Sequence, residues 1–349
     1  MFREHIIAIL TLQKIPGIGI KTVNKILSKY DSYSFKASTP KDVIEILKAE
    51  RVTLRSEKAV FQAWKEAEKI LRKSLEEHIV IISIKDSNYP KALSLIPDPP
   101  PLIHVRGDTH VFSRDGIAIV GTREPSEEGR KKATELGRLF AEKGYVIVSG
   151  LARGIDTAAH QGALEADAGL TVAVLAHGLH TIYPKDNKDL ADKIVENGGA
   201  LVSEHPWGAR PQRFEFVRRD RIQSGLSLGV IVVETGVKGG TMHTARFCKN
   251  QNRVLIVWEH PIRNHPKAEG NYKLIEDKMA DVILKENNIE EIVEKLDVVR
   301  RRLALHDKRI PKDEGKDVIN HKKKEKKGNR RRRNTTKFPQ ISLFDDKER

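Results

Sequence analysis

The sequence of 349 residues contains a single cysteine, Cys248, so the chain cannot form an internal disulfide. Cys248 lies in a helix-like segment without a His/Cys cluster at metal-ligand spacing, and we interpret it as a buried structural thiol. The scarcity of cysteine excludes a disulfide framework, and we expect the chain to reside in a reducing cytoplasm.

Long apolar runs are also missing. Residues 1–19, MFREHIIAILTLQKIPGIG, hold only short apolar runs interrupted by Glu4, His5 and Lys14. A membrane span needs about 20 consecutive apolar residues, and a signal peptide needs an uninterrupted apolar segment. We therefore expect neither of them, and no membrane partner.

The common catalytic signatures are missing as well. Histidines are numerous near the predicted strand ends, but no Ser/His/Asp order, metal-ligand spacing or Walker lysine stands out. Asp156 falls in the first turn of a predicted helix, where the helix dipole alone accounts for a carboxylate. We predict a protein that is not an enzyme, with no catalytic residue, metal ligand or cofactor.

Positive charge is what the sequence has in excess, with a formal net charge of +15 and an isoelectric point near 9.7. Such a balance favours a polyanionic partner. Residues 316–337 alone hold eleven Lys or Arg against two acidic residues. Because residues 301–349 are highly charged and poor in apolar side chains, we predict a disordered basic tail over 296–349, with salt-sensitive nucleic-acid contacts.

Residues 1–76 have apolar residues at spacings of three and four, which predicts a small all-helical domain. Within it, LTLQKIPGIGIKTV fits a helix, a glycine turn and a second helix. Such a helix-hairpin-helix turn presents backbone amides to a DNA phosphate, and Gly17, Gly19 and Lys21 are its candidate contacts. An ordinary Pro-Gly connection, or a docking surface for another protein, explains the same pattern.

Residues 77–295 alternate β-rich apolar runs with segments of helical periodicity. The predicted strands are 116–121, 145–150, 171–176, 199–204, 228–234 and 253–258, preceded by a strand at 79–84 and a proline-rich stretch at 97–101. The alternation is typical of an α/β fold with a doubly wound, mostly parallel, Rossmann-like sheet of about six strands. Ligands of such sheets bind at the carboxyl edge, so the residues after each strand form the candidate site.

The strand at 145–150 runs into SGLARGID, a glycine turn that opens a helix. Such a turn aims unpaired backbone N–H groups and the helix dipole at one point, which suits a phosphate. Gly150 and Gly154 allow the backbone of a ligand to approach, and Arg153 adds a planar cation. A tight strand-to-helix connection with a solvated arginine explains the segment equally well in isolation.

The loops after the other strands extend this anion site. Arg123 follows the first strand, Tyr183 and Lys185 follow the third, and a second glycine turn follows the fifth. After the fourth strand, arginines are interleaved with aromatic residues: Trp207, Arg210, Arg213, Phe214, Phe216, Arg218, Arg219 and Arg221. Cations that track a backbone, with aromatic faces for stacking, are typical of proteins that bind single-stranded nucleic acid. Each aromatic residue, taken singly, is also explained by packing in the core or in a dimer.

Over about residues 80–260 these motifs resemble the DprA/Smf family of bacterial DNA-processing proteins. The matching stretches include IAIVGTREPSEEG, SGLARGIDTAAH and RRDRIQSGLS. The resemblance implies an extended Rossmann-like fold, single-stranded DNA as the ligand, a homodimer, and loading of the RecA recombinase on that DNA during natural transformation and recombination.

By similarity, Arg123, Arg153, Lys185 and Arg221 fall on the basic pocket of the family, and Gly121, Gly150, Gly154 and Gly240 fall on its glycine turns. The predicted DNA site as a whole comprises Gly121, Arg123, Gly150, Arg153, Gly154, Lys185, Arg218, Arg219, Arg221, Gly239, Gly240 and Thr241.

The sequence departs from the family pattern in the carboxyl half of this pocket. Asp220 stands between two arginines where the family usually has Asn, and a carboxylate there would repel phosphate or pair with an adjacent arginine. The second glycine turn reads Lys-Gly-Gly-Thr at 238–241, and residues 259–261 replace a Pro-Gly pair. The resemblance therefore defines the fold more closely than the detailed site.

Near the end of the chain, QISLF resembles the short motif by which bacterial proteins dock on the DNA polymerase sliding clamp. Gln340 would be its head, and Leu343 and Phe344 would fill an apolar pocket of the clamp. An apolar pair has little structural reason to be present in a charged tail, which favours a binding role. Five-residue motifs, however, also recur by chance.

Two other functions stay open. Nucleotide phosphoribohydrolases of a related fold carry a glycine turn that residues 238–244 faintly resemble, but the Pro, the last Gly and the following Glu of that turn are absent here. A nucleotide sensor or phage-defence relative would keep the same fold and bind a different ligand.

Overall fold

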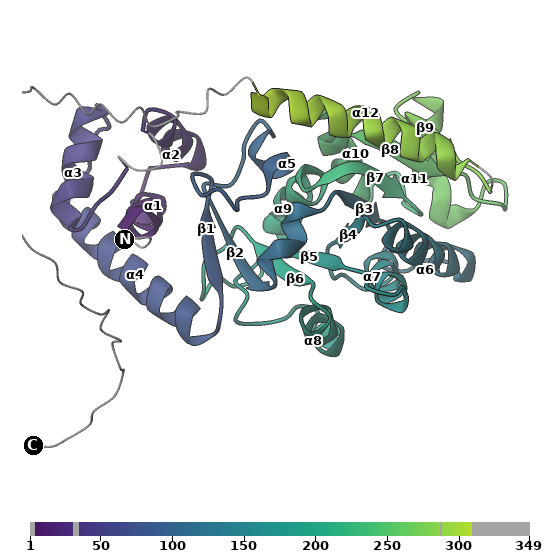
Figure 1. The fold of residues 1–349 in the computed structure, drawn as a ribbon, viewed down its shortest axis with the longest axis horizontal. Helices are drawn as coiled ribbons and strands as arrows, with labels where there is room; N and C mark the ends of the chain where they lie inside the picture. The colour runs from purple at the N-terminus through teal and green to yellow at the C-terminus, as the bar shows by residue number, and fades with distance from the viewer. Residues whose placement is uncertain (1–3, 31–34, 287, 309–349) are drawn as a thin grey trace, which may run out of the picture. The chain divides into compact units, whose positions relative to one another are not determined.

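The computed structural model describes residues 4–30, 35–286 and 288–308. Its first part is helical, as predicted, and is drawn in purple in Figure 1. Its helices are α1 (Glu4–Lys14), α2 (Ile20–Leu27), α3 (Pro40–Ala49) and α4 (Glu57–Glu76). Each of them buries one apolar stripe in a shared core, to which Ile9, Val23, Val43 and Trp64 contribute. Thr39 begins α3 with a capping box, which fixes where that helix starts.

The described residues then form one sheet of nine strands in the order β1-β2-β6-β5-β4-β3-β7-β8-β9. The strands are β1 (Val80–Ser83), β2 (Leu102–Gly107), β3 (Gly116–Val120), β4 (Val146–Ser149), β5 (Thr171–Leu175), β6 (Ala200–Ser203), β7 (Ser227–Val232), β8 (Val254–Trp258) and β9 (Val282–Leu284). From β6 to β9 neighbouring strands are parallel, whereas β1 and β2 pair antiparallel at one end. The predicted doubly wound, mostly parallel α/β sheet is confirmed.

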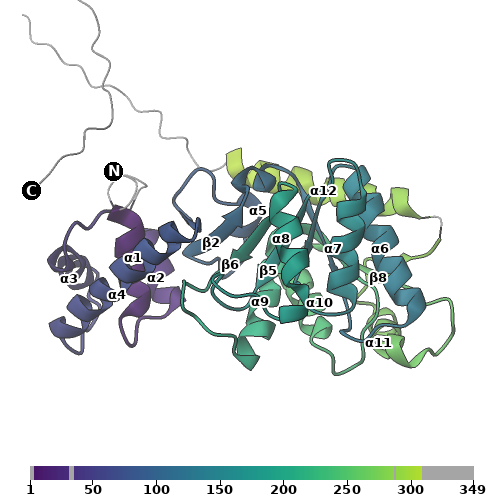
Figure 2. The ribbon, with the colours of Figure 1, turned by 90° about the horizontal axis from the view of Figure 1, so that it is seen from below.

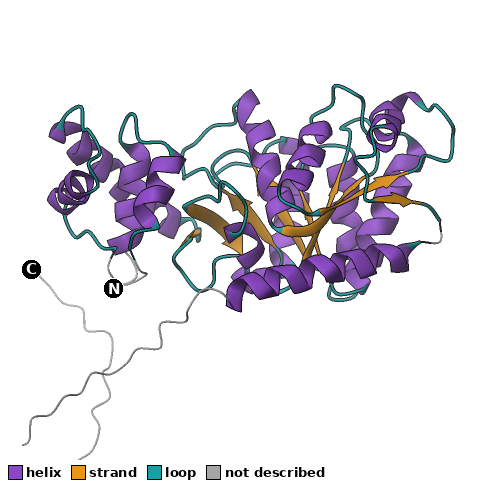
Figure 3. Ribbon diagram, turned by 90° about the horizontal axis from the view of Figure 1, so that it is seen from above, coloured by secondary structure: helices purple, strands orange, loops and turns teal. Residues whose placement is uncertain are grey.

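Helices cover both faces of this sheet, which Figure 3 shows in orange between purple helices. In β3, Ile117 and Ile119 belong to one apolar core, and Ala118 and Val120 belong to another. The first core is closed by α6 (Glu127–Glu142), α7 (Ile155–Glu165) and α12 (Ile289–Lys308). The second is closed by α5 (Lys91–Ser94), α9 (Arg213–Gly225), α10 (Thr241–Asn250) and α11 (Glu269–Glu276). Burial on both faces explains why the strands read as unbroken apolar runs.

The helix α8 (Lys188–Glu196) contacts α7 and packs against β5 and β6, and Figure 2 shows it beside α7 and α6. In the parallel part of the sheet, each βα unit brings the end of a strand and the start of the following helix to the same edge of the sheet. The twelve residues predicted for the DNA site all lie in the loops and helices that follow β3, β4, β5, β6 and β7.

The predicted start of the tail at residue 296 is wrong, because that position lies inside α12, which is described as far as Lys308. Leu296, Val299 and Leu303 are buried on one stripe of this helix, against the face that also holds α6 and α7. Together with Ile292, which is also fully buried, these residues give α12 an apolar stripe although the helix is otherwise highly charged. The remaining tail, with the motif at 340–344, lies outside the described residues.

None of the helices in the described part of the chain is both long and apolar enough to cross a membrane.

Candidate functional site

Two adjoining cavities lie where β3, β4 and β7 end, at the carboxyl edge of the sheet. The inner cavity has a volume of about 740 Å³ and the outer one about 350 Å³. Both are lined by Arg123, Ala152, Tyr183, Phe216 and Arg219. We call the two together the edge pocket.

The second glycine turn that the sequence indicated and the loop after β3 both line the inner cavity. Its walls include Gly121 after β3, and Gly239, Gly240 and Thr241 at the start of α10. A Cβ atom at Gly121 would lie 2.5 Å from Cγ1 of Ile155, so only glycine allows this close approach. The amino terminus of α10 therefore opens into the cavity and offers backbone N–H groups to an anion.

The outer cavity is lined by Gly150, Arg153 and Lys185, of which the two cations are exposed. Gly154 adopts a φ of +81° behind them, and a Cβ atom there would come within 2.5 Å of the Thr122 carbonyl oxygen. The Ile155 N–H donates to the same carbonyl at 3.1 Å, which ties the start of α7 to the loop after β3. This contact brings Arg123 and Arg153 to one opening.

Aromatic rings flank the exposed cations. The guanidinium carbon of Arg123 lies 5.6 Å from the centre of the Phe216 ring. The centres of the Tyr183 and Phe216 rings are also 5.6 Å apart. Tyr183 is 47% exposed, so its ring is accessible from the solvent. The edge pocket thus combines cations with a surface on which a planar base can stack.

The floor of the edge pocket is polar and buried. Arg219, only 5% exposed, donates to the Gly150 carbonyl at 2.9 Å and also to the Val174 carbonyl. A Cβ atom at Gly150 would lie 2.3 Å from Nη1 of Arg219, so the glycine makes room for this arginine. The Asp156 carboxylate accepts from the Gly150 N–H at 3.1 Å and from the Ala152 N–H at 3.3 Å.

Two carboxylates share this floor with one arginine. Burial raises the pKa of Asp220 to about 7; Arg219, with its Nε 3.2 Å from Oδ1 of Asp220, opposes this rise, and Asp156 reinforces it. Burial also raises the pKa of Asp156, again against the effect of Arg219. With the oxygen and nitrogen of its amide exchanged, an orientation that satisfies both atoms, Gln223 donates to Oδ1 of Asp220 at 3.2 Å. Near neutral pH the charge on the floor therefore depends on one proton on Asp220.

Nine of the twelve residues predicted for the DNA site line the edge pocket. The exceptions are Gly154, which supports the loop behind it, and Arg218 and Arg221. Arg221 is 2% exposed, and its guanidinium lies 2.5 Å from Oε2 of Glu204 and 3.2 Å from Oδ2 of Asp98.

Arg219 and Arg221 are both buried, and Arg219 still lines the edge pocket, so their contact with DNA stays a prediction. Both guanidinium groups form hydrogen bonds or ion pairs with carbonyl and carboxylate groups inside the protein. Conversely, Gln223, Thr235 and Thr244 line the inner cavity without having been predicted. They are brought there from three different segments by the fold, and no local pattern marks them.

The helix-hairpin-helix residues lie apart from the edge pocket, in the turn between α1 and α2. Gly17 has a φ of +92°, Gly19 precedes the first residue of α2, and Lys21 is exposed in its first turn. The turn has the conformation that the glycines predicted, and its contact with DNA stays a prediction.

The fold and the edge pocket define a Rossmann-like protein with exposed cations beside aromatic rings at the carboxyl edge of its sheet. A family model, described as DNA recombination-mediator protein A, matches residues 80–297, and the chain belongs to this family. The chain is 40% identical to Protein Smf of Escherichia coli over 237 residues, which cover 64% of this chain and 61% of that protein. It is 38% identical to DNA processing protein DprA of Bacillus subtilis over 228 residues, which cover 65% of this chain and 76% of that protein. The chain thus spans about three fifths of the E. coli relative.

Two solved structures have a similar fold. DNA processing protein A of Streptococcus pneumoniae matches with a TM-score of 0.66 at 31% identity, covering 78% of this chain and 92% of that one. DNA processing protein A of Helicobacter pylori, whose structure was described for its single-stranded DNA binding mode, matches with a TM-score of 0.53 at 28% identity. The match covers 65% of this chain and 96% of that one.

Proposed function

We propose that the edge pocket binds the backbone of single-stranded DNA and that the protein mediates recombination without catalysing a reaction. The observation that carries this proposal is the meeting of two glycine turns with exposed Arg123, Arg153 and Lys185 at one opening. Backbone N–H groups and cations hold phosphates, and the rings of Tyr183 and Phe216 offer faces to unpaired bases. The family and the single-stranded DNA bound by the H. pylori relative support the same ligand.

The test is the affinity of the full chain for a labelled dT oligonucleotide and for a matching duplex. Arg123→Glu with Lys185→Glu is expected to weaken single-strand binding at least tenfold. Arg138→Glu with Lys143→Glu makes the same charge change at exposed positions near the far end of α6 and is the matched control. Equal affinities of the two double variants would overturn the proposal.

A chain shortened to residues 1–308 separates the edge pocket from the basic tail while keeping α12 whole. We expect the shortened chain to keep its preference for the single strand and to lose part of its affinity at low salt. Loss of the preference together with the tail would assign single-strand recognition to the tail instead.

Further partners belong to the proposal. We infer that the protein is a cytoplasmic homodimer that helps RecA to form on single-stranded DNA, and that Gln340, Leu343 and Phe344 bind the sliding clamp. RecA loading is tested by the lag in RecA ATPase activity on DNA already covered by single-strand-binding protein. Clamp binding is tested by immobilised clamp against the full chain and against Leu343→Ala with Phe344→Ala.

A nucleotide sensor is the second candidate, and the polar floor of the inner cavity favours it. A cavity of about 740 Å³ accommodates a mononucleotide, and Asp220 offers a carboxylate to its base. A rise in melting temperature with one nucleotide of a panel, in the absence of DNA, would support this function. Release of free base from that nucleotide would instead indicate the hydrolase.

A further inference from the structure

The helix α4 carries a row of cations along its exposed face. Its 20 residues hold five Lys or Arg and four Glu, so its total charge is nearly balanced and does not mark the row in the sequence. At about 100° per residue, however, Lys58, Lys65, Lys69 and Arg72 fall within a sector of about 60° and extend over about 21 Å of the helix. All four are exposed, and the buried residues of α4 lie on the opposite side. We call these four residues the α4 stripe.

The glutamates of α4 leave most of the stripe unpaired. Three of them are paired with residues outside the stripe: Glu57 with Lys48, Glu66 with Lys14, and Glu68 with Trp64. The fourth, Glu76, lies at the carboxyl end of the helix, 2.5 Å from Lys73 and 3.9 Å from Arg72. The ammonium groups of Lys58, Lys65 and Lys69 have no bonded partner among the described residues. Their solvent counterions can therefore be exchanged for the phosphates of a nucleic acid.

Aromatic rings lie beside the stripe and at its end. Phe61, 40% exposed, adds a ring to the same side of the helix. At the carboxyl end, Nζ of Lys73 lies 6.0 Å from the centre of the Trp207 ring, and the indole N–H of Trp207 donates to Glu77 at 2.6 Å. These contacts fix the end of α4 to the loop that follows β6.

This loop leads from α4 to the edge pocket. Arg210 and Arg213 follow Trp207, and both are exposed and form no ion pair with the described residues. Arg213 begins α9 and lines the inner cavity. Unpaired cations are thus present in the edge pocket, in this loop and on the α4 stripe.

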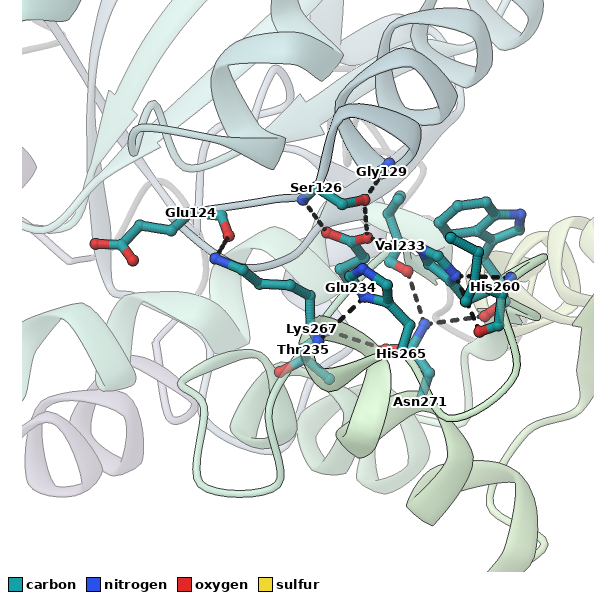
Figure 4. A network of polar contacts seen from close by, with 12 residues as sticks. Glu124, Ser126, Gly129, Val233, Glu234, Thr235, His260, His265, Lys267 and Asn271 are labelled. Atoms are coloured by element: carbon teal, nitrogen blue, oxygen red, sulfur yellow. Dashed lines mark hydrogen bonds and ion pairs between the residues drawn. The ribbon is translucent and has the colours of Figure 1, made fainter.

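The region beyond β8, on the other side of the edge pocket, has a balanced charge. In the network of Figure 4, Lys267 donates to the Glu124 carbonyl at 2.6 Å, and Glu234 places a buried carboxylate beside His260. The cavity of about 1050 Å³ in this region is lined by three cations and three carboxylates: Lys132, Arg263, Lys285, Glu259, Glu276 and Glu286. A polyanion in the edge pocket is therefore attracted toward α4 more strongly than toward β8.

We propose that the α4 stripe binds the backbone of the same DNA single strand where that strand leaves the edge pocket. The strand would pass over the loop after β6, with phosphates at Arg213, Arg210 and the stripe, and with the ring of Phe61 available to a base. This inference rests on the proposed function, because the strand reaches the stripe from the edge pocket. It adds a second contact region that a short strand held in the edge pocket cannot reach.

The experiment compares a short dT oligonucleotide of about 6 nucleotides with a long one of about 30, both bound by the full chain. Lys58→Gln with Lys65→Gln and Lys69→Gln, called the stripe variant, should bind the long strand at least tenfold more weakly at low salt. Its affinity for the short strand should be unchanged. Because each phosphate contact on a single strand contributes about 0.7 to the slope of log affinity against log salt, the slope for the long strand should become shallower by about 2.

The matched control removes three exposed lysines at or just after the carboxyl ends of α6, α8 and α11: Lys143→Gln, Lys193→Gln and Lys278→Gln. These helix ends lie at the amino edge of the sheet, opposite the edge pocket. The control has the same net charge and the same basic tail as the stripe variant. It should bind both strands as the unchanged chain does.

Cross-linking gives a second readout that leaves the stripe lysines in place. Gln62 is exposed beside the stripe, and the one native cysteine, Cys248, is fully buried. Gln62→Cys therefore provides a single accessible thiol. We expect it to react with a long strand that carries a thiol-reactive group at one of a series of positions. Glu142→Cys, at the carboxyl end of α6, should not react with any of these strands.

The proposal is overturned if the stripe variant binds the long strand as tightly as the control does, or if it weakens binding of both strands equally. It is also overturned if no position of the long strand cross-links to Gln62→Cys. A loss of affinity confined to duplex DNA would assign the stripe to double-stranded DNA instead. The proposed function fails by a different result, which is unchanged binding of the short strand by Arg123→Glu with Lys185→Glu.

Discussion

Two sets of cations near the edge pocket look alike in the sequence and differ in the structure. Arg123, Arg153 and Lys185 are exposed at the opening of the pocket, whereas Arg219 on its floor and Arg221 outside its lining are buried and bound to carboxylates or carbonyls. An exposed cation can exchange its counterions for a DNA phosphate, but a buried one is already committed to its protein partners. Mutating the first set should change binding, and mutating the second should change stability.

The largest effect is expected from Arg221→Met, which removes a buried charge and keeps most of the side-chain volume. Glu204, with 5% of its side chain exposed, would lose its 2.5 Å partner and remain buried as a carboxylate. We expect a loss of about 3–5 kcal/mol in the free energy of unfolding, measured by urea denaturation.

Arg218→Met is the control, since Arg218 lies one turn away, is 44% exposed in its side chain and is 3.8 Å from the same carboxylate. It should cost less than about 1 kcal/mol. If Arg221→Met left stability unchanged and abolished DNA binding, the assignment of Arg221 to the protein interior would be refuted in favour of a direct DNA contact.

The next effect concerns the proton on Asp220. Because burial raises the folded-state pKa of Asp220 to about 7, well above the ordinary value of an aspartate, the folded chain binds this proton more tightly than the unfolded chain does. The free energy of unfolding of the unchanged chain should therefore fall, relative to Asp220→Asn, as the pH rises from about 4 to 7. Above the folded-state pKa of Asp220, this loss in the free energy of unfolding relative to Asp220→Asn should level off at a few kcal/mol.

The same proton should affect DNA binding if phosphate occupies the inner cavity. Ionised Asp220 adds negative charge to the floor, so the affinity of the unchanged chain should fall between pH 6 and 8, and that of Asp220→Asn should fall less. Asp186→Asn, at an exposed carboxylate, should leave the pH dependence in place. Parallel pH profiles for Asp220→Asn and the unchanged chain would mean that Asp220 does not titrate in this range.

The sequence was sufficient to predict the central part of the fold. The strands from β3 to β8 are covered on both faces, so each is an apolar run bounded by glycine or charged residues, and their predicted limits lie close to the observed ones. In contrast, β2 was missed because it carries His104 and Arg106, and β9 because it has three residues. The helix α12 was missed because charge outweighs its apolar stripe.

The site was predicted less completely, for a physical reason. A glycine turn is a local feature, so Gly121, Gly150 and Gly240 could be placed at the edge pocket from the sequence. Whether an arginine is exposed depends on distant partners: Arg221 is paired with Glu204 and with Asp98, which no local pattern connects to it. Tertiary contacts, rather than composition, decide which charges remain available to a ligand.

A smaller effect is expected when the exposed cations are neutralised. Arg123→Gln with Lys185→Gln removes two phosphate contacts, and each contact to a single strand contributes about 0.7 to the slope of log affinity against log salt. We expect a slope shallower by about 1.4, and an unfolding free energy within about 0.5 kcal/mol of the unchanged chain. Arg138→Gln with Lys143→Gln should leave the slope as it is. An unchanged slope in the first variant would place the phosphates elsewhere, for example on the tail.

The smallest effect should come from Asp186→Asn, which releases Arg153. In the structure Nε of Arg153 lies 2.9 Å from Oδ2 of Asp186, and the two side chains are 66% and 62% exposed. Such a pair contributes between 0 and about 1 kcal/mol, so its loss should leave the melting temperature nearly constant. An arginine freed from its carboxylate binds phosphate without first breaking that pair, and the affinity for dT oligonucleotides should rise by about two- to threefold at low salt. Asp189→Asn, on the first turn of α8, is the matched control. If Asp186→Asn weakened binding instead, the pair would be needed to hold Arg153 in position, and the exposed cations would be as dependent on their protein partners as the buried ones are.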